Sequence, residues 1–359
     1  MQQYLDLVDS VLSEGAYKPN RTGVDTISSF SQHYEIDLAA GYPLLTTKKM
    51  DGYRWNSMIH EMCWYLSGEE HIRDLREETK IWDAWADDDG RLDTAYGRFW
   101  RRFPIPDDES RLEGETWADA ASGSADAAPD DVASGEPVGS QWVTREADGR
   151  QTFDQLQYVI DQLSDNPNSR RLVVNAWHPA NAAVSTLPPC HYSFVFNVQG
   201  DRLNCHLTQR SGDVALGIPF NIAAYALLTN VVAQQTGLEA GTFGHTIVDA
   251  HVYCGTGERG AWYADNLEAL QDRLAAVDPR EDREAYADVR EWLLEEAPDE
   301  AEGEERYDHV PNLLRQCTRE PLERPRLQLA DVTIDDLSAD DVELVDYESH
   351  DGLRFAVAE

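Results

Sequence analysis

The chain has 359 residues, and its 67 aspartates and glutamates outnumber its 30 lysines and arginines, which gives a formal net charge of −37 at pH 7. A surface this negative repels phosphate backbones and anionic lipids, so the composition argues against nucleic-acid binding and against attachment to a membrane. Hydrophobic residues still make up 42% of the chain, which is enough for a sizeable core. Length alone predicts about two domains, at roughly 150 residues each.

Lysine is rare in this chain. It occurs at Lys18, Lys48, Lys49 and Lys80, and arginine supplies the other basic charges. Such a bias, with acidic residues almost everywhere, is typical of proteins from salt-loving microbes. In molar salt the Debye length falls to about 3 Å, so the self-repulsion of an acidic surface is screened. We therefore expect a halophilic protein.

The cysteines give no sign of a disulfide framework or a zinc site, because they number five and none forms a CxxC pair. The first residues lack the basic region and apolar run of a signal peptide. No stretch is apolar for long enough to cross a bilayer. These features predict a reduced, cytoplasmic protein that holds no metal.

In chain order, apolar spacing first predicts a helix over residues 4–12, followed by a loop at 20–23. A buried helix is expected over 55–66, where Ser67-Gly68 would end it. Residues 104–150 are rich in Ala, Ser, Gly, Asp, Glu and Pro, which predicts an inserted, weakly ordered surface segment.

A helix is predicted next over residues 153–163, and then a strand at 172–174. Alternating apolar residues predict a hairpin of two strands, 192–198 and 203–207, that turns at Gly200-Asp201. Residues 220–232 are apolar on nearly all faces, as expected of a buried central helix.

Residues 249–253 alternate like the end of a strand, and a second acidic insertion follows over 262–314. Leucines and Trp292 recur within it at helical spacing, which favours short helices over disorder. This pattern alone supports a mixture of helices and strands.

Cys190 is a candidate nucleophile. It follows Pro188-Pro189 and precedes the first hairpin strand, so two rigid residues would hold it at the mouth of that strand. A free thiol has a pKa near 8.5 and stays mostly protonated at pH 7 unless cations lower that pKa. The alternative is a small buried hydrophobic residue, an interpretation that suits Cys63 and Cys205.

Four arginines, Arg21, Arg170, Arg171 and Arg210, lie beside apolar segments rather than in solvated charge runs. Guanidinium groups match phosphate oxygens, so together these arginines favour a phosphorylated small ligand. Ion pairing of each arginine with nearby carboxylates is the alternative.

Polar binding groups gather in the loop 209–221, which leaves a strand and opens the buried helix. Ser211 can bind a phosphate, Asp213 can accept from a donor-rich heterocycle, and Asn221 can pair with the amide-like edge of a base. Without further context, Asn221 would be a helix cap and Asp213 a turn former.

Glu61 lies within an otherwise apolar helix, where burial would raise its pKa and let it shuttle protons. A buried structural glutamate is the alternative. Trp82 and Trp85 could stack on a flat ligand, although paired tryptophans are more often part of a core. His251 and Tyr253 place two polar side chains on one face of a strand end.

Taken in this order, the segments resemble the folate-dependent thymidylate synthases. The motifs that carry the resemblance are Arg21-Thr22-Gly23, His60-Glu61, Ile81-Trp82-Asp83, Tyr96-Gly97, Arg170-Arg171, Pro189-Cys190-His191, 209–221 and 249–253. Because they fall in both halves of the chain, we expect one catalytic domain over 1–359 with two acidic insertions. The resemblance implies an α+β fold, in which helices flank a large, mostly antiparallel or mixed sheet.

The resemblance implies that dUMP is methylated to dTMP by 5,10-methylenetetrahydrofolate, without metal, NAD or flavin. By motif position, the residues implied in catalysis are Cys190, Glu61, Tyr96 and His191. Those implied in dUMP binding are Arg21, Arg170, Arg171, Gln209, Arg210, Ser211, Asp213, Asn221, His251 and Tyr253. Those implied in folate binding are Lys48, Ile81, Trp82, Trp85, Asp213, Leu216, Gly217 and Ala358. Arg170 and Arg171 would reach in from a partner subunit, so the site would require a homodimer.

Two other functions remain open at this point. A pyrimidine nucleotide hydroxymethylase would use the same thiol chemistry but quench the methylene intermediate with water. A cytosine-binding enzyme would gain from a carboxylate where Asn221 stands, so this amide favours the synthase. A catalytically inactive nucleotide-binding or RNA-binding regulator is disfavoured by the presence of Cys190 and Glu61 and by the net charge of −37.

Overall fold

The computed structural model describes residues 1–20, 23–92, 96–105, 140–147, 149–278, 280–299 and 306–357. A seven-stranded sheet runs through the molecule in the order β1-β2-β10-β8-β7-β6, and β9 pairs with β10 beside it. These strands are β1 (Ala16–Lys18), β2 (Thr26–Asp37), β6 (Val173–Asn175), β7 (His191–Gln199), β8 (Arg202–Gln209), β9 (Gly212–Asp213) and β10 (Glu239–Tyr253). The sheet is mixed, because β10 runs parallel to β8 and β9 and the other pairs are antiparallel. The predicted α+β class is confirmed.

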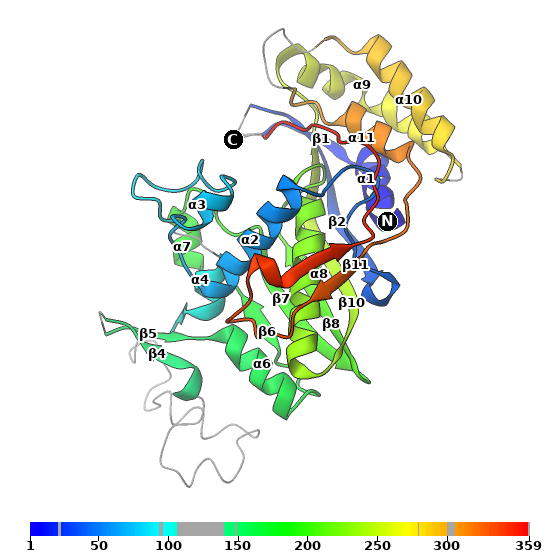
Figure 1. Ribbon diagram of the computed structural model, residues 1–359. Coiled ribbons are helices and arrows are strands. Elements are labelled where there is room, and N and C mark those ends of the chain that lie inside the picture. The colour runs from blue at the N-terminus through cyan, green and yellow to red at the C-terminus, as the bar shows by residue number, and fades with distance from the viewer. Residues whose placement is uncertain are drawn as a thin grey trace.

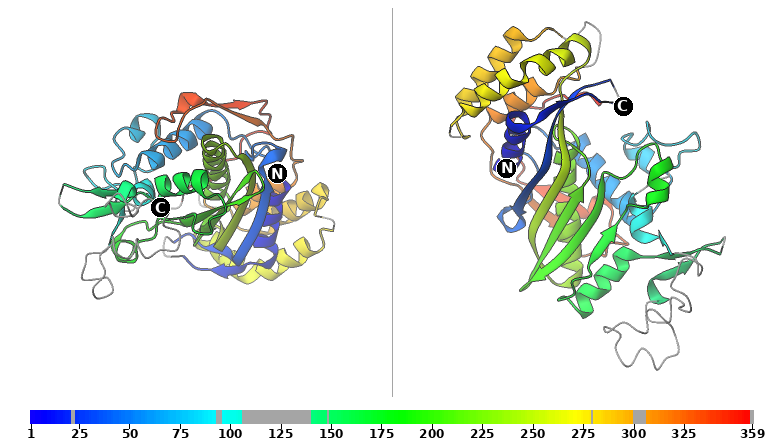
Figure 2. Two further views of the ribbon diagram at one scale, coloured as in Figure 1. Left: turned by 90° about the horizontal axis from the view of Figure 1, so that it is seen from below. Right: turned by 180° about the vertical axis from the view of Figure 1, so that it is seen from behind.

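Helices lie around this sheet (Figure 1). The α-helices that the structure describes are α1 (Gln2–Glu14), α2 (Tyr53–Ser67), α3 (Leu75–Glu78), α4 (Tyr96–Arg101), α6 (Gln155–Asp165), α7 (Pro179–Val184), α8 (Gly217–Thr236), α9 (Gly257–Ala275), α10 (Arg283–Glu296) and α11 (Val310–Cys317). Short 3-10 turns lie at Leu38–Ala40, Ser140–Trp142 and Ala339–Asp341. Seen from behind, strands β2, β10, β8 and β7 lie in front of α2 and α8 (Figure 2, right).

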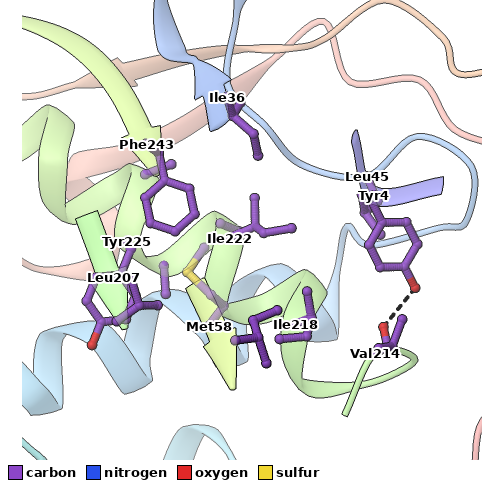
Figure 3. Packing of buried hydrophobic residues seen from close by; sticks show 14 of the residues in the cluster. Tyr4, Ile36, Leu45, Met58, Leu207, Val214, Ile218, Ile222, Tyr225 and Phe243 are labelled. Atoms are coloured by element: carbon purple, nitrogen blue, oxygen red, sulfur yellow. Dashed lines mark hydrogen bonds between the residues drawn. The ribbon is translucent and has the colours of Figure 1, made fainter. Parts of the chain in front are cut away.

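The predicted central helix is α8, which is buried almost all round because the sheet and α2 both contact it. Figure 3 shows Met58 of α2, Ile222 of α8 and Phe243 of β10 converging in this layer. Each is at most 1% exposed, and burying such a side chain stabilises the fold by about 2 kcal/mol. The Tyr4 hydroxyl of α1 donates to the Val214 carbonyl at 2.9 Å, so α1 is tied to the loop that leads into α8.

The predicted hairpin is β7 and β8, joined by Gly200 with a φ of 69°, a conformation that favours glycine. The predicted helices over 4–12 and 55–66 are α1 and α2, and α2 ends at Gly68, as expected. The predicted start of the next helix is wrong by two residues. Residue 153 is the last residue of β5 (Gln151–Phe153). The Asp154 side chain accepts from the Gln157 amide at 2.9 Å and caps α6, which begins at Gln155.

Most of the first predicted insertion, 106–139 and 148, lies outside the described residues. Its flanks form a small sheet in the order β3-β5-β4, with β3 at Phe103–Pro104, β4 at Val143–Arg145 and β5 at Gln151–Phe153. These flanks contact the rest of the protein, because Trp142 packs edge-on against Tyr158 of α6 with 4.9 Å between ring centroids.

The second insertion contains the predicted helices, which are α9 and α10. The first of them, α9, starts at Gly257, before the expected bound of the insertion at 262. Arg259 Nε and Asp308 Oδ2 form a buried ion pair at 2.7 Å that joins α9 to the segment before α11. Beyond it, β11 (Arg326–Leu329) and β12 (Val342–Val345) form a two-stranded sheet near the chain end. In the described part of the chain, no helix is long and apolar enough to cross a membrane.

Candidate active site

The predicted nucleophile lies where β7 begins. His191 and Gln209 are paired across β7 and β8, so the next residues outward, Cys190 and Arg210, are neighbours. The Arg210 backbone amide donates to the Cys190 carbonyl at 2.9 Å, and Arg210 Nη2 lies 3.4 Å from Cys190 Sγ. The cation expected beside the thiol is therefore Arg210.

The arginine is also bonded to the two prolines that precede the cysteine. Arg210 Nε donates to the Pro189 carbonyl at 2.9 Å, and Nη2 donates to the Pro188 carbonyl at 2.6 Å. Proline restricts the backbone φ angle, which helps to keep these two carbonyls in position to accept the hydrogen bonds from Arg210. One side chain thus holds the turn on which the thiol stands.

Burial raises the pKa of the Cys190 thiol above its ordinary value, while Arg210 and a hydrogen bond with Tyr96 lower it in part. The thiol therefore stays protonated at neutral pH in this arrangement. The sequence predicted activation by cations, and the structure provides one cation that only partly offsets burial. Nucleophilic attack by this thiol would first require loss of that proton.

Tyr96, the first residue of α4, supports the same turn from the other side. Its hydroxyl accepts from the Cys190 amide at 2.8 Å, and its ring stacks on His191 with 3.7 Å between centroids. Gly97 allows this approach, because a Cβ there would lie 1.9 Å from the Tyr65 carbonyl oxygen. The Tyr-Gly pair of the sequence motif thus places α4 directly against α2.

His191 points away from the reacting side of the turn. It is 6% exposed, and its Nδ1 lies 2.8 Å from the Tyr225 hydroxyl of α8. Burial lowers the pKa of His191 to about 3, so the ring is neutral. A neutral ring that is stacked and hydrogen-bonded can position Tyr96 and Cys190, but it does not change its protonation state near pH 7.

Glu61 lies on α2, and two donors converge on its Oε1. The Trp82 indole donates at 2.7 Å and the Tyr65 hydroxyl donates at 2.9 Å. Burial raises the pKa of Glu61 to about 7, and these two hydrogen bonds oppose the rise. The predicted rise in pKa is confirmed, and the carboxyl can exchange a proton at working pH.

The loop after β8 places three of the expected binding groups together. Gln209 Nε2 donates to Asn221 Oδ1 at 3.1 Å and to the Ser211 carbonyl at 2.9 Å. Asp213 Oδ1 accepts from the amides of Ala215 and Leu216, so its role as a turn former is confirmed.

Asn221 is not the cap of α8. The helix begins at Gly217 with Leu216 at its N-cap, so the capping interpretation is wrong and Asn221 lies one turn inside the helix. Its Oδ1 is held by Gln209 instead. The side chain is therefore available for recognition rather than for the helix end.

His251 lies beside this loop, because it pairs with Asp213 across β10 and β9. Its ring meets Tyr253 edge-on, with 5.3 Å between centroids. Lys48 is 4% exposed, and its ammonium donates to the Ala215 carbonyl at 2.6 Å. Burial lowers the pKa of Lys48 to about 7. Polar groups from β10, α8 and the segment before α2 thus approach one loop.

The expected aromatic surface is present. The Trp82 ring meets that of Trp85 edge-on, with 5.7 Å between centroids, and is tilted against that of Tyr96, with 6.0 Å between centroids. Ile81 precedes Trp82 in the same partly exposed turn. Because Trp82 also binds Glu61, this surface adjoins the buried carboxyl.

Some predicted residues are not joined to this group. Arg170 and Arg171 are exposed in the loop between α6 and β6. Arg21 and Ala358 lie outside the described residues. Among those described, no group of three or more His, Cys, Asp or Glu side chains is arranged to hold a metal ion.

Sequence reasoning missed Tyr65, Tyr225, Tyr34 and His245. Tyr65 binds Glu61, and Tyr225 binds His191. His245 could have been found, because it lies between Phe243 and Ile247 at the inward-facing positions of a strand, where a polar side chain requires partners.

Comparison with known proteins decides among the functions that remained open. The family model described as thymidylate synthase matches residues 2–359. The chain belongs to the thymidylate synthase family. It is 65% identical to a thymidylate synthase of Haloferax volcanii over 354 residues, which cover 99% of this chain and 96% of that protein.

Thymidylate synthases are methyltransferases that convert dUMP to dTMP with 5,10-methylenetetrahydrofolate as co-substrate, and this is the activity of the chain. The comparison does not favour a hydroxymethylase or an inactive regulator. The relative comes from a halophilic archaeon, in agreement with the halophilic composition of this chain.

Proposed function

We propose that Cys190 is the nucleophile of the thymidylate synthase reaction and adds to C6 of the uracil ring. The 3.4 Å contact between Arg210 Nη2 and Sγ carries this proposal. Addition at C6 makes C5 nucleophilic, and the folate co-substrate supplies the one-carbon unit and the hydride. The thiol has to lose its proton first, which the arginine favours.

Glu61 is the proposed proton carrier. With a pKa of about 7, its carboxyl is present in both protonation states at neutral pH, so it can exchange protons at uracil O4 and at the folate through ordered water. Burial raises the pKa of Tyr96 well above its usual range, so the hydroxyl keeps its proton. Tyr96 would therefore assist removal of the C5 proton by hydrogen bonding, while His191 positions it.

We propose that Asn221 binds the O4 and N3 edge of uracil. Ser211, Arg210 and Arg21 would bind the phosphate, together with arginines from a second subunit. His251 and Tyr253 would bind the ribose hydroxyl. The proposed folate contacts are Lys48, Ile81, Trp82, Trp85, Asp213, Leu216, Gly217 and Ala358. Support comes from the loop after β8, which gathers amide, hydroxyl and carboxylate groups beside the thiol.

A homodimer is proposed, with Arg170 and Arg171 contributed across the interface. Phe30 of β2 is 83% exposed and lies on the strand that pairs with β10 in the middle of the sheet. An aromatic side chain so exposed on a sheet favours burial against a second copy. Both arginines are exposed in the single chain, as a contribution to a neighbouring subunit's site requires.

We also propose that residues 1–359 act as one catalytic domain with two acidic insertions, and that the protein works in the cytoplasm. Its cysteines, all within the described residues, are free thiols, which suits a reducing compartment.

The first test compares Cys190→Ala with Cys63→Ala as a matched thiol control. With dUMP and methylenetetrahydrofolate in multimolar KCl, the near-ultraviolet absorbance rise of dihydrofolate should vanish in Cys190→Ala and persist in Cys63→Ala. Undiminished turnover by Cys190→Ala would remove it from the mechanism. Nucleotide consumption without the absorbance rise would indicate quenching by water.

The second test mixes two inactive variants. Cys190→Ala and the double variant Arg170→Ala/Arg171→Ala are unfolded in urea, combined and refolded in KCl. In mixed dimers one of the two sites regains both the thiol and the arginines, so about one quarter of all sites should recover. No recovery, with dimers present by light scattering, would place these arginines in the same subunit as their site.

A further inference from the structure

His245 is a buried polar residue without a part in the mechanism above. It lies on β10, is 0% exposed, and is the register partner of Tyr34 on β2. Its Nδ1 lies 2.6 Å from the Tyr34 hydroxyl, and its Nε2 lies 3.0 Å from Gln209 Oε1. Gln209 in turn contacts Asn221, so the side chains form a row across β2, β10, β8 and α8.

The protons in this row can be assigned. Burial lowers the pKa of His245 to about 3 and raises that of Tyr34 well above its usual range, so both groups are neutral at working pH. A neutral imidazole has one N–H. The Ser211 carbonyl only accepts, so the NH2 of Gln209 faces it and the amide oxygen faces His245. Nε2 of His245 must therefore carry the hydrogen, and Nδ1 then accepts from the Tyr34 hydroxyl.

These partners together hold the carboxamide of Gln209 in one orientation. If the amide rotated by 180°, its NH2 would face the N–H of His245, and its oxygen would face the Ser211 carbonyl and Asn221 Oδ1. All three hydrogen bonds would then be lost in a buried site, at a cost comparable to an unsatisfied polar group. The NH2 of Gln209 therefore faces Asn221, whose Oδ1 must lie toward it.

The orientation of Asn221 matters because uracil and cytosine present opposite patterns. Uracil offers an N3–H donor beside the O4 acceptor, and cytosine offers an N3 acceptor beside the N4 amino donor. An asparagine free to turn over can pair with either base, whereas a fixed one can pair with only one.

We propose that His245 and Tyr34 are positioning residues that set the preference for uracil over cytosine, by holding Gln209 and, through it, Asn221 in one orientation. The inference rests on the proposed role of Asn221 in base recognition. Neither residue contacts the nucleotide in this proposal. Their effect is selective, because it acts on the order of donor and acceptor and not on the phosphate or ribose contacts.

The test measures the dissociation constants of dUMP and dCMP by calorimetry in multimolar KCl, alongside kcat/KM for dUMP. His245→Leu removes the donor to Gln209, and we expect the ratio of the two constants to fall about tenfold, as for one lost buried hydrogen bond. His245→Gln can restore an N–H near the position of Nε2 and should recover most of the ratio. Thr229→Val is the control, because it removes another fully buried hydrogen bond, from Thr229 to the Tyr225 carbonyl. It should leave the ratio unchanged.

A folded His245→Leu protein with an unchanged ratio overturns the proposal, even if both nucleotides bind more weakly. An equal fall in Thr229→Val overturns it too, because the effect would then be general loosening of the core. If His245→Leu does not fold, Tyr34→Phe decides the matter. In Tyr34→Phe, the imidazole of His245 has lost the hydroxyl that donates to Nδ1 and can take either tautomer. The ratio of the dUMP and dCMP dissociation constants should then fall several-fold. The binding ratio is read without catalysis, so absence of turnover by the unmodified enzyme would count against the proposed function and not against this inference.

Discussion

Replacing Glu61 by glutamine tests whether a buried carboxyl with a shifted pKa lies at the centre of the site. Burial raises the pKa from the ordinary 4.5 to about 7, so the folded protein favours the neutral form. The folded state binds more protons than the unfolded state between these two values, and the free energy of unfolding therefore falls as pH rises through that window. Above pH 7 the ionised carboxyl costs about 3 kcal/mol.

Glu61→Gln retains an oxygen that can accept from Trp82 and Tyr65 but cannot ionise. From pH 5 to pH 8 we expect its free energy of unfolding to rise by about 2 to 3 kcal/mol relative to the unmodified protein, measured by urea denaturation in multimolar KCl. Turnover should fall by about 10² to 10⁴, because the proton carrier is lost.

Glu77→Gln is the matched control, since Glu77 is an exposed carboxyl on the neighbouring helix α3. This control should leave the change in the free energy of unfolding between pH 5 and pH 8 as it is in the unmodified protein. If Glu61→Gln shows the same pH dependence as the unmodified protein, the carboxyl does not titrate in this window and the reasoning from burial is wrong.

Three further predictions follow from the described contacts. Trp82→Phe removes a hydrogen bond that lowers the pKa of Glu61, so the limb of the kcat profile near pH 7 should move to higher pH; a shift to lower pH would contradict this. Ile222→Ala, at a 0% exposed position of α8, should cost 2 to 5 kcal/mol of stability by denaturation, and a cost below about 1 kcal/mol would mean that the core collapses around the site. The melting temperature should rise with KCl, because salt screens a net charge of −37, and a midpoint independent of KCl would exclude surface repulsion as the main destabilising force.

The sequence predicted elements whose apolar pattern is local. The hairpin around Gly200 and the buried α8 each follow from a few consecutive residues, and both are present. The small sheet beside the first insertion was missed, because its strands β3, β4 and β5 have two or three residues each, too few to show a period. The parallel pairing of β10 with β8 was not predicted either, since it depends on contacts between distant segments.

Motif order predicted the chemical groups of the site, but the motifs do not contain the contacts between them. The Arg210 guanidinium holds the two proline carbonyls and approaches Cys190, contacts that motif spacing does not show. Burial keeps His191 neutral between Tyr96 and Tyr225. Such roles depend on burial and on partners from other elements, which spacing along the chain does not reveal.

The burial of Glu61 and Lys48 has a consequence for adaptation to brine. Mobile ions act on charges that face the solvent, whereas these two groups titrate among the indole, hydroxyl and carbonyl partners that hold them at 2.6 to 2.9 Å. Their pKa values are thus governed mainly by the protein and only weakly by the salt of the medium. Added surface carboxylates therefore leave the ionisation of these two groups nearly unchanged, because the exterior and the interior of the site respond to different dielectric environments.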